Sequence, residues 1–165
     1  MAEIDTDRLI WIVVGIQLTA ELGDRPLAYK VEAEMKRRLG EKLGAAPPNG
    51  PPRLAPVVVS DVFYLNSEEA QDRPAISIGG PGMNALAALL TDQLPTPVAI
   101  ENTLVIQMDL ELKDQRVSVW GMNHLDTVRA VDLFVSKGYL DTFVDGVIAR
   151  LEQEEDDDPG THGGS

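Results

Sequence analysis

Three segments of the chain are mostly apolar and are bounded by polar or glycine-rich stretches. They are residues 9–16 (LIWIVVGI), 56–65 (PVVVSDVFYL) and 75–80 (AISIGG). Runs of this length, rich in β-branched side chains, are typical of strands that are buried on both faces of a parallel sheet. We therefore predict three buried strands, with Asp61 near the carboxyl end of the second or in the turn that follows it.

Residues 104–113 follow a different pattern. Beginning with Leu104, every second position is leucine, isoleucine or methionine, and most of the positions between them are polar. This period of two indicates a strand with one face on the core and the other largely in water. A polar turn (KDQR) and a second apolar segment (VSVW) follow, so we predict an antiparallel hairpin beside the parallel sheet.

The first helical pattern follows the first strand after a loop at residues 17–24. Apolar residues recur there at helical spacing, at Leu27, Val31, Met35 and Leu39. We expect the helix to begin near Arg25, with Asp24 as its N-cap and Pro26 in its first turn. A glycine, at position 40 or 44, is expected to end it.

Two further helical regions are predicted downstream. Residues 81–94 form the helix that the third strand feeds, and it stops before Pro95. Residues 124–155 are helical in pattern, and Gly138 divides them into two helices because glycine is favoured directly after a helix ends. Strands that alternate with helices predict one α/β domain over residues 1–152, a Rossmann-like three-layer sandwich whose mostly parallel sheet carries an antiparallel hairpin. Residues 153–165, acidic and then glycine-rich, are expected to be disordered.

Composition narrows the possible functions. The 165 residues include 27 acidic and 14 basic side chains, a net charge of −13, and no cysteine. This charge repels nucleic acid and anionic lipid, so neither is expected as a partner. Because there are no thiolates and only His124 and His162 could supply imidazole, no zinc site is expected. The acidic first residues and the short apolar run after them predict a cytoplasmic protein that has no membrane segment.

The segments SIGGPGMNALAALL and SVWGMNHLDTVRAV both run from strand through Gly-Met-Asn into helix. This weak repeat predicts two similar turns at one edge of the sheet, where helix N-termini in α/β domains often hold anions. We therefore take the turn residues as candidate ligand-binding positions: Gly79, Gly80, Asn84, Gly121, Asn123 and Asp126. Both turns also have a purely structural interpretation, in which the glycines permit tight turns and the asparagines cap helices.

Three further residues complete the candidate set. Gly15 ends the first strand, Asp61 follows the second, and Arg25 lies near the first strand–helix loop, where it could face a bound anion. Each has an ordinary alternative as a turn, cap or surface residue. His124 beside Asp126 is a weaker acid–base candidate. Asp109 and Glu111 share one face of a predicted strand, which would suit a divalent cation or be simply solvated.

The turn motifs resemble those of archaeal S-layer-type domains and, more loosely, bacterial cell-wall-binding repeats. The resemblance covers residues 74–135 and rests on two sets of residues: Gly79, Gly80, Pro81 and Asn84 in the first, and Gly121, Asp126, Thr127 and Ala130 in the second. It implies a similar sheet topology and a structural domain that assembles with copies of itself.

The sequence leaves three functions open. The leading prediction is a non-catalytic binding, interaction or regulatory module that binds a small anionic ligand, another protein or a second copy of the chain. The second is a small enzyme or sensor that holds a nucleotide or sugar-phosphate at the strand ends. The third is the self-assembling domain that the resemblance implies. No motif indicates a particular cofactor, and neither turn matches the dinucleotide-binding or Walker sequence patterns.

Overall fold

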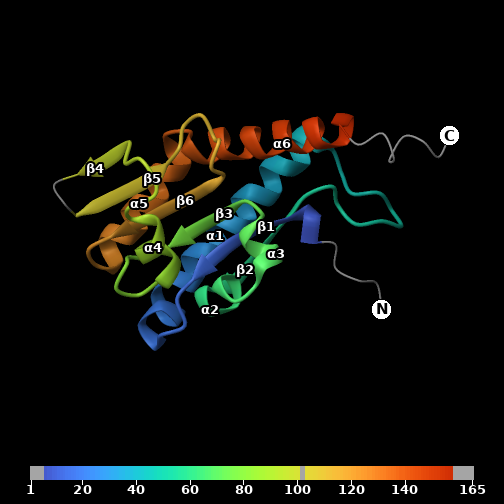
Figure 1. Cartoon of the computed structure of the whole chain (residues 1–165). Coiled ribbons are helices and arrows are strands. Elements are labelled where there is room, and N and C mark those ends of the chain that lie inside the picture. The colour runs from blue at the N-terminus through green and yellow to red at the C-terminus, as the bar shows by residue number, and fades with distance from the viewer. Residues whose placement is uncertain (1–5, 101–102, 158–165) are drawn as a thin grey trace.

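The computed structural model describes residues 6–100 and 103–157. A short 3-10 helix at Thr6–Arg8 leads into the first strand. The strands are β1 (Leu9–Val14), β2 (Ala55–Ser60), β3 (Ala75–Ile78), β4 (Val98–Ile100), β5 (Leu104–Met108) and β6 (Arg116–Gly121). The helices are α1 (Leu18–Leu43), α2 (Asp61–Leu65), α3 (Glu68–Gln71), α4 (Ala85–Leu90), α5 (His124–Ser136) and α6 (Tyr139–Asp157). Figure 1 shows their arrangement.

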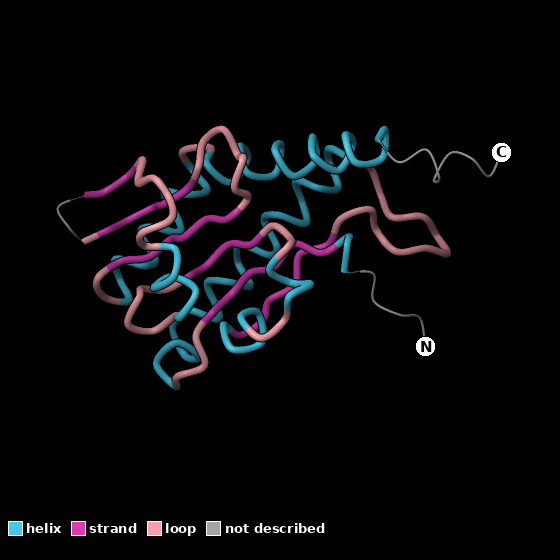
Figure 2. The backbone as a smooth tube through the Cα atoms, in the orientation of Figure 1, coloured by secondary structure: helices cyan, strands magenta, loops and turns pink. Residues whose placement is uncertain are grey.

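The strands form one mixed sheet in the order β2-β1-β3-β6-β5-β4. The pairs among β2, β1, β3 and β6 are parallel, whereas β5 runs antiparallel to both β6 and β4. Figure 2 shows the β4–β5 pair extending one end of the sheet. The predicted mostly parallel α/β sheet with an antiparallel hairpin is therefore confirmed.

Helices cover both faces of the sheet, which gives three layers. Helices α1, α5 and α6 pack on one face over the larger core, whose members include Ile12, Ile76 and Phe134. The shorter helices α2, α3 and α4 lie on the other face over a smaller core around Trp11, Tyr64 and Leu86. β1 and β3 are thus buried on both sides, as their apolar sequences indicated. β2, also predicted as a buried strand, is instead an edge strand whose residues are mostly half-buried, and β5, predicted to have one face largely in water, is mostly buried.

The first helix begins earlier than the sequence suggested. Residues 18–24, predicted as a loop, form its first turns, and Gln17 rather than Asp24 is the N-cap. Pro26 therefore lies inside α1, where it removes the hydrogen bond that its amide would make to Leu22. Leu22 is exposed, so water can reach that end of the helix. Asp24 is therefore not a cap but a buried residue in the second turn of α1.

The second predicted strand is shorter than expected. β2 ends at Ser60, and the apolar residues after it form the single-turn helix α2. Ser60 caps that helix by accepting a hydrogen bond from the amide of Phe63 at 3.0 Å. The polar loop predicted next contains the short helix α3, which Ser67 caps in the same way. Local capping by serine therefore overrides the apolar run.

The hairpin β5–β6 is present, but β5 stops at Met108. Asp109 turns the chain, because its carboxylate accepts hydrogen bonds from the amides of Glu111, Lys113 and Asp114. These bonds, led by that from Glu111, lower the pKa of Asp109. The expectation that Asp109 and Glu111 share a strand face is therefore wrong.

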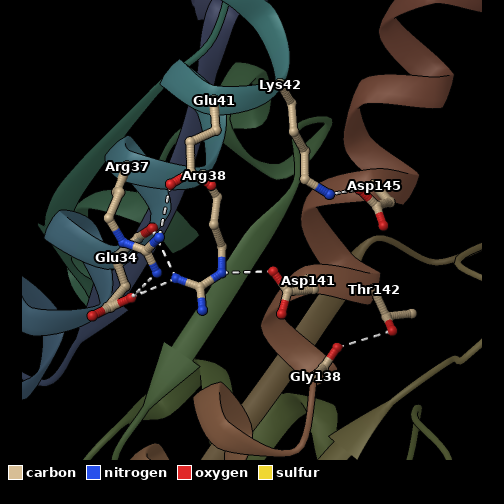
Figure 3. A network of polar contacts seen from close by, with 9 residues as sticks. All are labelled: Glu34, Arg37, Arg38, Glu41, Lys42, Gly138, Asp141, Thr142 and Asp145. Carbon is tan, nitrogen blue, oxygen red and sulfur yellow. Dashed lines mark hydrogen bonds and ion pairs between the residues drawn. The ribbon is translucent and has the colours of Figure 1, made fainter.

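The two long helices α1 and α6 are joined by ion pairs (Figure 3). Arg38 donates to Asp141 at 2.7 Å and to Glu34 at 2.5 Å, and Lys42 pairs with Asp145. Arg38 is nearly buried, so its two carboxylate partners compensate for its desolvation.

Gly138 divides the C-terminal helical region as predicted, with φ at +84° between α5 and α6. Helix α6 continues to Asp157, so the first residues of the predicted disordered tail are helical. Residues 158–165 lie outside the described part of the chain. No helix within that part is long and apolar enough to span a bilayer.

Candidate functional site

A pocket of about 740 Å³ opens at the carboxyl ends of the parallel strands β3 and β6. Three segments line it: the first turns of α1 (Leu18 to Asp24), the β3–α4 loop (Gly80 to Met83), and the end of β6 with the start of α5. In the sheet, β1 lies between β2 and β3. The connection after β1 leads to its neighbour on one side, and the connection after β2 leads to its neighbour on the other side. The pocket therefore lies at a topological switch point, the usual place for ligands in open α/β sheets.

The walls of this pocket are mainly apolar. Trp120, Met83, Met122, Leu18 and Leu22 all line it. Three of these side chains are unusually exposed for their type, with 73% of Leu18, 72% of Leu22 and 65% of Met122 accessible to solvent. Large apolar side chains gathered around one concavity mark a binding surface more often than scattered ones do.

Asp24 is the buried charge of the pocket. It is 8% exposed, and neither of its oxygens accepts a hydrogen bond from any residue in 6–100 or 103–157. Burial raises the pKa of Asp24, and the nearby imidazole of His124 partly opposes that change. An ionised carboxylate without donors is costly to bury. A contribution to the stability of the fold therefore does not explain why an aspartate lies at position 24.

The backbone of the β3–α4 turn is shaped around that carboxylate. Gly79 has φ at +108°, and a Cβ at this position would lie 2.5 Å from Oδ2 of Asp24. A side chain at position 79 would therefore be strained and would also displace Asp24. The first glycine of the turn thus makes room for a side chain from α1, a role that turn chemistry alone does not require.

His124 is the first residue of α5 and lies on the exposed rim of the pocket. Its ring packs against α1, because a Cβ at Gly23 would lie 2.9 Å from Nδ1 of His124. Gly23 therefore lets α1 and α5 approach, which places His124 beside Asp24. These two are the titratable side chains among the described residues that line the pocket.

The two asparagines of the repeated turn cap their helices. Asn84 is fully engaged: its amide donates to the carbonyls of Val13 and Ile78 at 2.9 and 3.0 Å. Its Oδ1 accepts from the first turn of α4. Asn84 therefore ties β1 and β3 together and does not line the pocket. Asn123 accepts one bond, from the amide of Asp126 at 2.9 Å, and does line the pocket.

Gly121 lets α5 fold back closely on β6. A Cβ there would lie 2.3 Å from the carbonyl carbon of Asp126. The Thr127 hydroxyl accepts a hydrogen bond from the Gly121 amide at 3.1 Å. The glycine and threonine of this second motif therefore fix the start of α5 on the sheet. Asp126 itself is buried, lies 3.4 Å from Arg129 and is not part of the pocket lining.

The remaining candidates have structural surroundings. A Cβ at Gly15 would lie 1.8 Å from the carbonyl oxygen of Met83, so Gly15 allows the β3–α4 loop to cross the end of β1. Asp61 accepts hydrogen bonds from the amides of Val62 and Ala85, each at 2.8 Å. Arg25 is bonded to its helix neighbours Glu21 and Tyr29.

Of the nine sequence candidates, Gly80, Gly121 and Asn123 line the pocket, and Gly79 contacts its buried carboxylate. The sequence predicts Asp24 as the N-cap of the first helix and therefore does not indicate that it lines a pocket. The spacing of Leu18 and Leu22 was the available signal, since both belong to one helical stripe once α1 is extended past Pro26.

No group of three or more histidine, aspartate or glutamate residues that could hold a metal ion occurs in the described ranges. No protein-family model matches the chain, and no curated protein matches it either. The resemblance to S-layer-type domains stays a prediction.

Proposed function

We propose that this protein is a non-catalytic, cytoplasmic binding module that holds a small, mostly apolar organic ligand in the pocket between α1, the β3–α4 loop and α5. The observation that carries the proposal is the pocket itself. Its volume of about 740 Å³ falls within the range of about 300–1,000 Å³ that small-molecule sites occupy. Apolar walls with a few polar groups are also typical of such sites.

The polar groups of the pocket disfavour the phosphate ligands that the sequence suggested. None of the described residues lining it is lysine or arginine, and Asp24 would repel an anion at close range. The first amides of α1 have no side-chain cap, but they lie in the same pocket as this carboxylate. The lining therefore supports a neutral or cationic ligand rather than a nucleotide or sugar-phosphate.

A thermal-shift screen with neutral and charged small molecules tests the proposal, because a ligand of the native state raises the melting temperature. Gly82→Leu provides the matched control. Gly82 lines the pocket, and a Cβ there would meet no atom within 4 Å. A leucine there therefore adds bulk to the pocket lining without a clash at its Cβ.

We expect stabilisation by a subset of apolar compounds in the wild type, and its loss in Gly82→Leu. Stabilisation that survives in Gly82→Leu, or a screen in which no compound acts, contradicts the proposal. Light scattering at the same protein concentrations separates ligand binding from the alternative in which exposed Leu18 and Leu22 pair two copies of the chain.

A further inference from the structure

We infer that the ligand of this pocket is an amine, whose cationic group pairs with the Asp24 carboxylate while its apolar part contacts the surrounding walls. The inference rests on the proposed binding function and adds the chemical class of the ligand. Asp24 is the acidic side chain that the pocket buries.

The Asp24 carboxylate takes part in no hydrogen bond of the described fold. The residue is nine-tenths buried and faces the pocket, yet it caps no helix and accepts no hydrogen bond within the described ranges. The two other buried aspartates near strand–helix junctions have partners: Asp61 accepts two amide hydrogen bonds, and Asp126 accepts one from Arg129. A buried carboxylate without donors is expected where an incoming group supplies them.

The surrounding backbone preserves space for this carboxylate. Gly79 could hold no side chain without a contact of 2.5 Å to Oδ2, and its φ of +108° also requires glycine. The carboxylate thus occupies a position that the β3–α4 turn leaves open. Its titratable neighbour is the rim residue His124, whose side chain is exposed.

The other side chains that line the pocket indicate the chemistry of the apolar part of the ligand. Trp120, Met83 and Met122 present aromatic and thioether surface, which packs well against hydrocarbon or aromatic groups and, for tryptophan, attracts cations. The Trp120 indole nitrogen is itself buried without a hydrogen-bond partner among the described residues. The net charge of −13 adds a long-range field that favours cations.

A calorimetric comparison of two near-isosteric probes tests the inference. 2-Phenylethylamine is cationic at neutral pH, and 2-phenylethanol replaces its ammonium group with a hydroxyl. Each is titrated into the wild type, Asp24→Asn, Gly82→Leu and Asp92→Asn. The last variant removes one negative charge from an exposed position outside the pocket lining, and so controls for net charge.

We expect the wild type and Asp92→Asn to prefer the amine at least tenfold, and Asp24→Asn to reduce that preference to less than about threefold. Gly82→Leu should weaken both probes. Circular dichroism confirms that each variant is folded.

Equal affinity for the two probes, abolished by Gly82→Leu, overturns the amine inference and leaves the binding function intact. Amine preference that persists in Asp24→Asn also overturns it. If neither probe binds, the amine inference fails, and the broader screen alone decides whether the pocket binds a ligand.

Discussion

The same substitution at two buried aspartates should change stability in opposite directions. Asp24 and Asp61 are 8% and 5% exposed, and each belongs to the first or second turn of a helix. They differ in their hydrogen bonds: Asp61 accepts two from backbone amides, and Asp24 accepts none within the described residues. Replacing each with alanine therefore measures how much the hydrogen bonds to a buried carboxylate contribute to the free energy of unfolding.

Asp24→Ala should raise the free energy of unfolding by about 1–3 kcal/mol, because it removes a largely buried carboxylate that accepts no hydrogen bond from the described residues and improves helix propensity. Asp61→Ala should lower it by about 1–3 kcal/mol, because two amides lose their acceptor. For a chain of this size these changes correspond to about 2–4 °C in melting temperature per kcal/mol. Urea unfolding followed by circular dichroism measures both.

The effect of Asp24→Ala should also depend on pH. The pKa of Asp24 is raised in the folded state, so between its unfolded and folded pKa values the folded protein binds more protons, and wild-type stability falls as pH rises. The advantage of Asp24→Ala should thus be largest at neutral pH, shrink as the pH falls through the raised folded pKa, and be lost by about pH 4, the ordinary aspartate pKa. His124 on α5 is the other titratable group lining the pocket, so His124→Gln serves as a background control. A loss of stability in Asp24→Ala at pH 7 similar to that in Asp61→Ala would refute the reasoning.

Three further substitutions test how the turns are built, each by urea unfolding. Asn84→Ala should cost about 2–4 kcal/mol because it removes both the α4 cap and the bonds to β1 and β3; a cost below 1 kcal/mol would show that the bonds are dispensable. Gly15→Ala should cost about 1–3 kcal/mol because its Cβ would collide with the Met83 carbonyl, and unchanged stability would contradict that close approach. Gly138→Ala should cost about 1–2 kcal/mol for its positive φ, whereas Gly40→Ala, inside α1, should gain about 0.5–1 kcal/mol; equal effects at the two glycines would count against the assigned backbone conformations.

The sheet was predictable because β1 and β3 are mostly apolar on both faces and β5 alternates between apolar and other residues. The continuous runs at β1 and β3, and the alternation that begins at Leu104, correspond to observed strands. The Gly-Met-Asn turns also lie as expected, at the carboxyl ends of two neighbouring parallel strands, with Asn84 and Asn123 as helix caps.

The errors arose where short-range polar chemistry competes with an apolar pattern. Ser60 caps α2 within what looked like a continuous strand, and the exposed side chains of Val62 and Phe63 gave no period that would mark the change. Pro26 predicts a helix start, but α1 contains it in its interior, where the hydrogen bond that it removes would have gone to the carbonyl of the exposed Leu22.

The edge of the sheet that holds the pocket could be predicted, but its chemistry could not. Asp24, Gly79 and His124 come from separate segments, and their proximity depends on how α1 and α5 pack over the sheet. The sequence therefore predicts an anion at the helix N-termini, because no pattern in it places a carboxylate in the same pocket.

The two tryptophans of the chain provide the most direct test of where a ligand binds. Trp120 lines the pocket, whereas Trp11 is buried under α2, where it contacts Phe63. In a ¹⁵N-labelled protein their two indole N–H signals can be followed during a titration with 2-phenylethylamine. We predict that the Trp120 signal shifts and saturates while that of Trp11 stays in place, and that Gly82→Leu suppresses the shift. A Trp120 signal that does not respond to a ligand that binds would contradict the assignment of this pocket.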